Sequence, residues 1–191
     1  MEHKPLVGLA MCGSYCTYAQ VFAAAAALRK DYRLLGIMSE TAAETDTRFG
    51  TAVTNLRRLM ELTGEPVVTT IAEAEPLGPA RPMDALLIAP CTGNTLAKLA
   101  HGLTDSAVTM AAKAHLRNGR PLLIAFSTND ALSASAENIG RLLNRRSVFF
   151  VPFRQDDAEK KPRSAQADFT LLPAALEAAL RGEQLQPILR G

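Results

Sequence analysis

The sequence lacks tryptophan altogether, and aromatic residues make up only 5% of its 191 positions. Cysteine is also scarce: three residues, an odd number in a chain of this size, argue against a disulfide framework and fit a reducing compartment. Neither sign of charge dominates, because 21 Lys and Arg face 19 Asp and Glu, and no basic run with interleaved aromatics occurs. The charge pattern therefore gives no indication of a nucleic-acid partner.

Long apolar runs, an export signal and a metal-binding motif are absent as well. Residues 1–4 lead directly into the apolar run 6–11, which is too short for a membrane span and has no basic leader before it. No spacing of His, Cys and Asp matches a zinc site. We therefore expect a cytoplasmic protein that binds neither a membrane nor a structural metal.

What the sequence does contain is an alternation of short apolar runs with helical patterns, and 48% of its residues are hydrophobic. Continuous apolar runs are typical of strands buried on both faces, and parallel strands need helices to return the chain across the sheet. We therefore predict an α/β three-layer sandwich with a mostly parallel sheet of about five or six strands, flavodoxin- or Rossmann-like. The predicted strands are 5–11, 34–38, 67–71, 85–89, 122–126 and 148–151, and the predicted helices are 15–30, 53–60, 92–101, 105–118 and 131–143.

The length predicts one domain over residues 1–191, because a domain typically has about 150 residues. Within it, residues 152–170 are polar, charged and proline-containing, and we expect them to form a charged loop. Residues 171–182 are predicted to form the C-terminal helix, which Pro173 opens in its first turn. One such domain leaves no space for a separate nicotinamide-binding domain.

The loop after the first predicted strand has the composition of an anion site. Ligands of this fold class bind beyond the carboxyl ends of the strands, where Gly13 and Ser14 lie between a strand and a helix start. Exposed N–H groups and the helix dipole there favour a phosphate, although the same two residues also suit an ordinary turn and helix cap. The glycines do not follow G-x-G-x-x-G, so a mononucleotide phosphate suits the loop better than a dinucleotide.

The loop after the strand at 85–89 carries a cluster of small hydrogen-bonding side chains. Thr92, Asn94 and Thr95 can cap the following helix and still face the crevice, where they would suit a planar polar ligand. Ordinary helix capping is the alternative interpretation of the same residues.

The same loop resembles a motif of a known superfamily. Residues 90–98, Pro-Cys-Thr-Gly-Asn-Thr-Leu-Ala-Lys, are similar to the P-x-[ST]-x-[NK]-T-L-A motif of the homo-oligomeric flavin-containing cysteine decarboxylase (flavoprotein) superfamily. That superfamily includes phosphopantothenoylcysteine decarboxylases and flavin prenyltransferases. Gly13-Ser14 matches its early G-[AS]-S phosphate loop, and Ser39 matches its Ser/Thr position after the second strand.

Within this superfamily, longer segments resemble the B-subunit family of dipicolinate synthases. These segments are 45–50, 128–132, 138–140 and 151–162, and the resemblance runs from residue 5 to about residue 189. It implies a trimer-based cytoplasmic homo-oligomer that works during sporulation with the larger, dehydrogenase-like A subunit of dipicolinate synthase. The implied joint reaction is the NAD(P)-linked oxidation of dihydrodipicolinate to dipicolinate (pyridine-2,6-dicarboxylate), with NAD(P) on the larger partner.

The resemblance also implies FMN as the cofactor of this chain and indicates the residues that would hold it. They are the two phosphate-loop residues, the hydroxyl after the second strand, the 92–95 loop and two residues after the strand at 122–126. The set is Gly13, Ser14, Ser39, Thr92, Gly93, Asn94, Thr95, Thr128 and Asn129. No catalytic residue is identified.

The sequence departs from the superfamily at two places where its chemistry is performed. Residues 127–130, Ser-Thr-Asn-Asp, stand where decarboxylases carry a Pro-x-Met-Asn clamp and prenyltransferases an Arg-Glu pair. No His follows the second strand, where decarboxylases keep a catalytic base, and both His101 and His115 belong to helical patterns. An FMN-dependent decarboxylase or prenyltransferase-like protein is therefore an alternative, and a non-catalytic binding protein within the complex is another.

Several charged residues outside these loops are candidate ligand contacts. Lys160, Lys161 and Arg163 would bind or steer a dianionic dicarboxylate, or else belong to a solvated surface loop. Lys98 and Lys113 are expected on outer helix faces.

Two further pairs of residues allow a structural and a functional interpretation. Asp46 and Arg48 either form an ion pair that fixes their connector, which we favour, or contact the substrate. Cys12 and Cys16 lie at a helix start, where the pKa of a thiol can be lowered, but small buried cysteines are common and we favour that interpretation.

Overall fold

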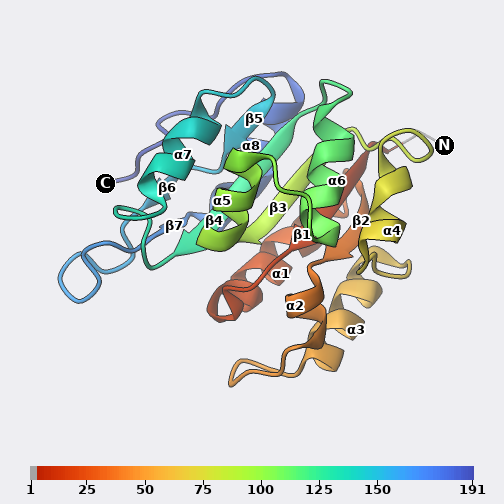
Figure 1. Ribbon diagram of the computed structural model, residues 1–191, viewed down its shortest axis with the longest axis horizontal. Coiled ribbons are helices and arrows are strands. Elements are labelled where there is room, and N and C mark those ends of the chain that lie inside the picture. The colour runs from red at the N-terminus through yellow and green to blue at the C-terminus, as the bar shows by residue number, and fades with distance from the viewer. Residues whose placement is uncertain (1–3) are drawn as a thin grey trace.

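A seven-stranded sheet forms the centre of the computed structural model, which describes residues 4–191 (Figure 1). Five strands are joined by parallel pairing. Two short strands pair antiparallel with one another, and one of them also pairs antiparallel with the end of β4. The order is β2-β1-β3-β4-β7-β6, with β5 also pairing with β4. The strands are β1 (Leu6–Met11), β2 (Arg33–Met38), β3 (Ala85–Cys91), β4 (Leu122–Thr128), β5 (Val148–Phe150), β6 (Phe153–Arg154) and β7 (Ala165–Ala167).

Helices cover both faces of this sheet, so the predicted flavodoxin-like three-layer architecture is confirmed. One face packs against α4 (Ile71–Ala74), α5 (Gly93–His101), α6 (Ala107–Leu116) and α7 (Ala136–Leu143). The other face packs against α1 (Tyr18–Leu28), α2 (Glu40–Glu44), α3 (Ala52–Thr63) and α8 (Leu172–Leu180). No helix in the stretch from residue 4 to residue 191 is long and apolar enough to cross a membrane.

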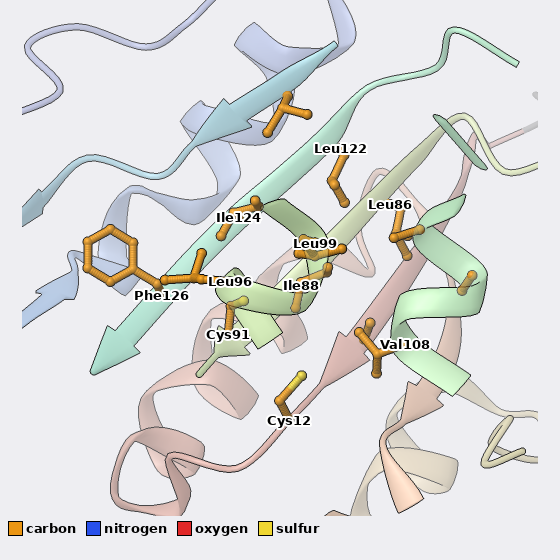
Figure 2. Close-up of a cluster of buried hydrophobic side chains, with 14 of the residues drawn as sticks. Cys12, Leu86, Ile88, Cys91, Leu96, Leu99, Val108, Leu122, Ile124 and Phe126 are labelled. Carbon is orange, nitrogen blue, oxygen red and sulfur yellow. The ribbon is translucent and has the colours of Figure 1, made fainter. Parts of the chain in front are cut away.

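The central strands β1 and β3 are apolar at every position because each of their faces is buried. In β3, Leu86 and Ile88 lie in the cluster under α5 and α6, whereas Leu87 lies in the cluster on the opposite face. Figure 2 shows the first cluster, which extends across β4 to the aromatic ring of Phe126. Burial on both faces explains why the sequences of these strands are continuously apolar and do not alternate between apolar and polar residues.

Several predicted boundaries differ from the structure. The β-branched run at 67–71 contributes only one bridge, Ile37 to Val68, because Thr70 and Glu73 form a capping box that begins α4. The predicted helix at 131–143 begins at Ala136, after a turn. The sheet has seven strands rather than five or six because 152–170, predicted as a charged loop, contains β6 and β7, which are too short to show a periodic pattern.

A buried histidine on α6 makes folding stability depend on pH. His115 is 1% exposed, and its Nε2 lies 2.9 Å from the carbonyl oxygen of Pro121 at the start of β4. Burial lowers the pKa of His115 below 6.5, with a smaller lowering from Arg120 and opposing effects of the Pro121 hydrogen bond and Asp84. Between the two pKa values the unfolded chain binds more protons, so this residue's stabilisation is present above pH 6.5 and is lost below it.

We therefore expect the free energy of unfolding to rise as the pH approaches 6.5 from below, and His115→Gln to flatten this rise. Urea unfolding at a series of pH values measures the slope. His101→Gln is the matched control, because His101 is exposed at the end of α5. An identical slope in the wild type and His115→Gln would contradict the assignment.

Candidate functional site

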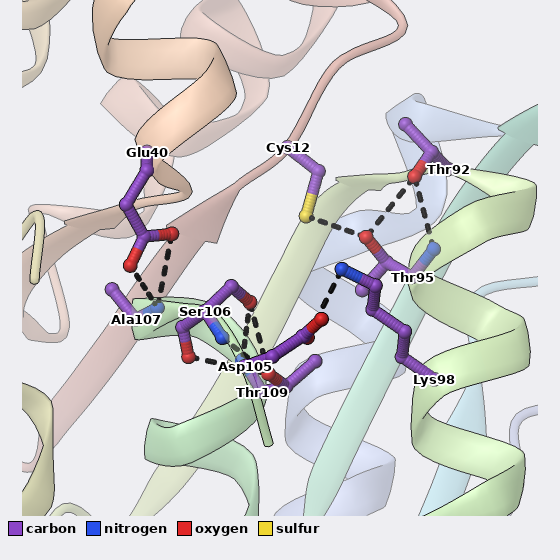
Figure 3. Close-up of polar contacts among 9 residues, drawn as sticks. All are labelled: Cys12, Glu40, Thr92, Thr95, Lys98, Asp105, Ser106, Ala107 and Thr109. Carbon is purple, nitrogen blue, oxygen red and sulfur yellow. Dashed lines mark hydrogen bonds and ion pairs between the residues drawn. The ribbon is translucent and has the colours of Figure 1, made fainter. Parts of the chain in front are cut away.

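A polar cavity of about 400 Å³ opens beyond the carboxyl ends of β1, β2 and β3. This is the place where ligands bind in open parallel sheets, and the volume lies in the usual range for small-molecule sites. Three strand-to-helix loops and the start of α6 build its wall, part of which is drawn in Figure 3. The lining residues are Cys12, Gly13, Ser39, Glu40, Thr41, Thr92, Asn94, Thr95, Lys98, Asp105 and Ser106.

The loop after β1 is held close to the neighbouring strands. The Cys12 N–H donates to the carbonyl oxygen of Pro90 at 3.1 Å, and the Ser14 hydroxyl donates to the carbonyl oxygen of Ser127 at 2.7 Å. A Cβ atom at Gly13 would lie 3.2 Å from Cγ2 of Thr92, so glycine permits the close approach of the two loops here. Ser14 has a left-handed backbone with φ of 62°, which turns the chain sharply before α1.

The loop after β3 caps α5 and lines the cavity with the same side chains. Thr92 Oγ1 accepts from the Thr95 N–H at 3.1 Å and donates to Thr95 Oγ1 at 3.0 Å. Thr95 Oγ1 in turn donates to Cys12 Sγ at 3.3 Å, as Figure 3 shows. The amino-terminal end of α5, with its partial positive charge, therefore adjoins the cavity beside a row of hydroxyl groups.

Cys12 and Cys91 have the properties of buried structural residues. Burial raises the pKa of Cys12 to about 11, outweighing the lowering by the hydrogen bonds of Thr95 and Thr92. Cys91 is also buried, and burial raises its pKa well above 9.0. Both thiols therefore stay protonated near neutral pH and are poor nucleophiles. Cys16, by contrast, is exposed at the start of the first helical turn.

Three charged side chains, Glu40, Lys98 and Asp105, also line the cavity. Lys98, expected on the outer face of its helix, instead lines the cavity and pairs with Asp105 at 3.0 Å. Its spacing of three and four residues from Thr95 and Asn94 puts it on their helix face, a signal that could have located it. Glu40 accepts the Ala107 N–H at 3.0 Å and so joins α2 to the start of α6.

The nine residues predicted for flavin binding fall into two groups. Five of them line the cavity: Gly13, Ser39, Thr92, Asn94 and Thr95. Ser39 also caps α2, because its Oγ accepts the Ala42 N–H at 3.3 Å. The other four, Ser14, Gly93, Thr128 and Asn129, are absent from the lining formed by the described residues. Cavity residues that sequence reasoning did not assign to the site are Cys12, Glu40, Thr41, Lys98, Asp105 and Ser106.

The residues after β4 form a tight junction with the start of α5. The hydroxyls of Thr128 and Ser135 both donate to Asp130 Oδ1. A Cβ atom at Gly93 would lie 2.6 Å from Ser135 Oγ and 2.7 Å from Thr128 Oγ1, so only glycine fits against this junction without a shift. Asn129, between Thr128 and Asp130, is exposed.

Lys160, Lys161 and Arg163 lie in the connection between β6 and β7, and none of them lines the cavity among the residues described. Lys161 pairs with Asp156 at 3.1 Å, and the Lys160 N–H donates to Asp157. All three are exposed, as in the solvated-loop interpretation.

The connector before α3 is fixed by a cap rather than by an ion pair. Asp46 Oδ1 accepts the Ala52 N–H at 2.8 Å, which supports the structural interpretation of Asp46. The Arg48 guanidinium lies over the ring of Phe49, 4.8 Å from its centroid. Within residues 4–191 the predicted pairing of Arg48 with Asp46 does not occur.

The α/β sheet, covered by helices on both faces, and the polar cavity at the carboxyl ends of its strands define a protein of the flavodoxin-like class. The chain belongs to the Flavoprotein family, whose sequence profile matches residues 1–167. The dipicolinate synthase B subunit of Bacillus subtilis (strain 168) is 44% identical over 184 residues, which cover 96% of this chain and 92% of that protein. The predicted resemblance to this protein is thereby confirmed.

Two solved structures support the same relationship. The crystal structure of the dipicolinate synthase B subunit from Bacillus halodurans C has a TM-score of 0.90 and 41% identity, covering 98% of this chain and 96% of that one. A dodecameric FMN-dependent UbiX-like decarboxylase from Escherichia coli O157:H7 has a TM-score of 0.61 and 25% identity, with 77% of this chain and 79% of that one covered. The chain is thus also similar to a protein that uses FMN.

Proposed function

We propose that this chain is the FMN-binding B subunit of a dipicolinate synthase. With a larger, dehydrogenase-like partner, it would oxidise dihydrodipicolinate to dipicolinate. The observation that carries the proposal is the 44% identity to a dipicolinate synthase B subunit over 96% of the chain. The polar cavity, in the position where this fold class binds ligands, supports it independently of that identity.

The residues of the cavity fit the groups that FMN would present. Gly13 brings the backbone close to Thr92, and an N–H-rich turn with a helix start beside it suits a phosphate. The Ser39 hydroxyl lies on the same cavity wall, whereas the Thr92 hydroxyl and Asn94 carboxamide suit the polar edge of a planar ring system. FMN, when bound, supplies a reversible two-electron acceptor.

The proposed reaction requires a division of labour between two proteins. Formation of the aromatic ring of dipicolinate removes a hydride and a proton from dihydrodipicolinate. This chain has no G-x-G-x-x-G segment, so we assign NAD(P)⁺ and its binding fold to the larger partner. The task of this chain's residues is then to bind and orient, because the Cys12 thiol, with a pKa of about 11, neither attacks nor accepts a proton near neutral pH.

We further propose a cytoplasmic homo-oligomer, built from trimers and acting during sporulation. The dodecameric assembly of the UbiX-like relative supports an oligomer. The three free cysteines fit a reducing compartment.

The visible absorption spectrum of the purified chain, with and without added FMN, tests the cofactor proposal. The expected result is a protein-bound flavin band whose intensity saturates as FMN is added. A colourless protein that takes up no FMN across the titration would overturn it.

Asn94→Ala is expected to weaken FMN binding about tenfold, because one hydrogen bond contributes about 1–1.5 kcal/mol. The midpoint of unfolding should stay nearly unchanged, since Asn94 is exposed on the cavity wall. Fluorescence titration with FMN measures the affinity. Asn138→Ala on α7, outside the cavity lining, is the control. Unfolding of Asn94→Ala would favour the helix-capping interpretation of this residue. An unchanged affinity in the folded variant would mean that Asn94 has no binding role.

A further inference from the structure

The ion pair between Lys98 and Asp105 lies in the cavity wall and joins α5 to the segment before α6. Lys98 Nζ is 3.0 Å from Asp105 Oδ1. Figure 3 shows the ammonium group between Asp105 and the pair Thr95 and Cys12. Among the residues that the structure describes, Lys98 carries the only ammonium group that lines this cavity. The hydroxyl groups of Thr92 and Thr95 line the same cavity.

The two partners of this pair differ in their exposure. The Lys98 side chain is 24% exposed, whereas the Asp105 side chain is 60% exposed. An ion pair with such an exposed member contributes little to stability, so separating the two side chains costs little free energy. Asp105 can therefore turn into solvent while Lys98 keeps its place on the helix.

The second carboxylate of the cavity cannot move so easily. Glu40 accepts the Ala107 N–H with both oxygens, at 3.0 and 3.3 Å, at the positive end of the α6 dipole. With Glu40 held there, the lining residues Lys98, Glu40 and Asp105 carry one positive and two negative charges. This balance opposes an anionic ligand as long as Asp105 remains next to Lys98.

We propose that Asp105 is an exchangeable counter-ion and that Lys98 binds an anionic oxygen group of the ligand in its place. The group is a carboxylate of a pyridine dicarboxylate or the phosphate of a flavin mononucleotide. This proposal rests on the proposed function for the identity of these ligands. Charge-assisted hydrogen bonds from an ammonium group to either anion are among the stronger polar contacts, so Lys98 would select anionic ligands at this wall.

The test is to measure the binding of four probes to the full-length protein by calorimetry. Two probes carry the anionic groups, pyridine-2,6-dicarboxylate and FMN, and two are their matched controls, pyridine-2-carboxylate and riboflavin. The variants are Lys98→Met, Lys98→Arg and Asp105→Asn. Lys98→Met should lower the affinity for the anion that Lys98 binds about tenfold or more. Lys98→Arg should restore much of this binding, and Asp105→Asn should strengthen it about threefold or more.

The pattern of effects identifies the source of the anion. If the substitutions change the affinity for FMN but not the affinity for riboflavin, Lys98 binds the phosphate. Changes in affinity for the dicarboxylate that exceed those for the monocarboxylate assign Lys98 to a carboxylate of the dicarboxylate, which is the product of the proposed reaction. The proposal is overturned if Asp105→Asn binds the anions more weakly, or if Lys98→Met binds all four probes as the wild type does. Either result would mean that the ion pair has a structural role only. Thermal melting of each variant shows that it is folded.

The same titrations separate this proposal from the proposed function. A chain that binds no FMN, but whose dicarboxylate affinity responds to Lys98→Met and Asp105→Asn as expected, would refute the flavin cofactor and leave the counter-ion exchange intact. A chain that binds FMN normally in all variants, with an unresponsive dicarboxylate affinity, would refute only the exchange.

Discussion

Phe126→Ala is expected to lower the free energy of unfolding by about 3–5 kcal/mol, the usual range for removing a fully buried aromatic ring. Phe126 is 0% exposed, and its ring centroid lies 4.7 Å from that of Phe153 and 6.1 Å from that of Phe150. The three rings join β4, β5 and β6, and Phe126 precedes Thr128 at the end of β4 by two residues. Chemical denaturation measures the loss.

Leu143→Ala is the control for this substitution, because Leu143 is 44% exposed at the end of α7. We expect it to change stability by about 0.5 kcal/mol or less. A Phe126→Ala loss as small as that of the control would mean that the aromatic cluster does not hold this side of the sheet together.

Gly93→Ala is expected to destabilise the protein by about 1–3 kcal/mol and to weaken FMN binding. The added Cβ would lie 2.6 Å from Ser135 Oγ and 2.9 Å from Asp130 Oδ1, so α5 or the turn after β4 must shift. Because α5 also presents Thr92 and Asn94 to the cavity, a shift of its first turn alters the site. Denaturation and FMN titration measure the two effects.

The control for Gly93→Ala is another glycine in a helix with open space around it. A Cβ atom at Gly140, in α7, would meet nothing within 4 Å among the residues described. Gly140→Ala should therefore stabilise the protein by about 0.5–1 kcal/mol through the better helix propensity of alanine. If both substitutions have the same effect, the junction of Gly93 with Ser135 does not constrain α5.

The parts of the fold that the sequence predicted well are those whose residues have one strong local preference. β1 and β3 are apolar throughout because both faces are buried, and no other element type suits such short runs flanked by turn residues. Residues 67–71 failed as a strand because the Thr70 capping box competes with the β-branched preference of the preceding residues. β7 depends on pairing with β4, a tertiary contact that its three residues do not encode locally.

The candidate site shows the same division between local and tertiary information. Thr92 and Thr95 were predictable because a helix cap beyond a buried strand faces the crevice in this fold class. Asp105 and Glu40 were missed because their positions in the cavity depend on how α6 and α2 pack, which residue types along the chain do not reveal. Lys98 was placed wrongly although its helical spacing from Asn94 carried the information.

We propose that this chain takes part in the oxidation of dihydrodipicolinate together with a dehydrogenase-like partner. The most direct measurement is the rate of NAD(P)H formation from dihydrodipicolinate by that larger partner, first by itself and then with this chain added in increasing amounts. We predict that the rate rises with the concentration of this chain until the larger partner is saturated. A rate that stays the same across the whole titration, with both proteins folded, would contradict the claim.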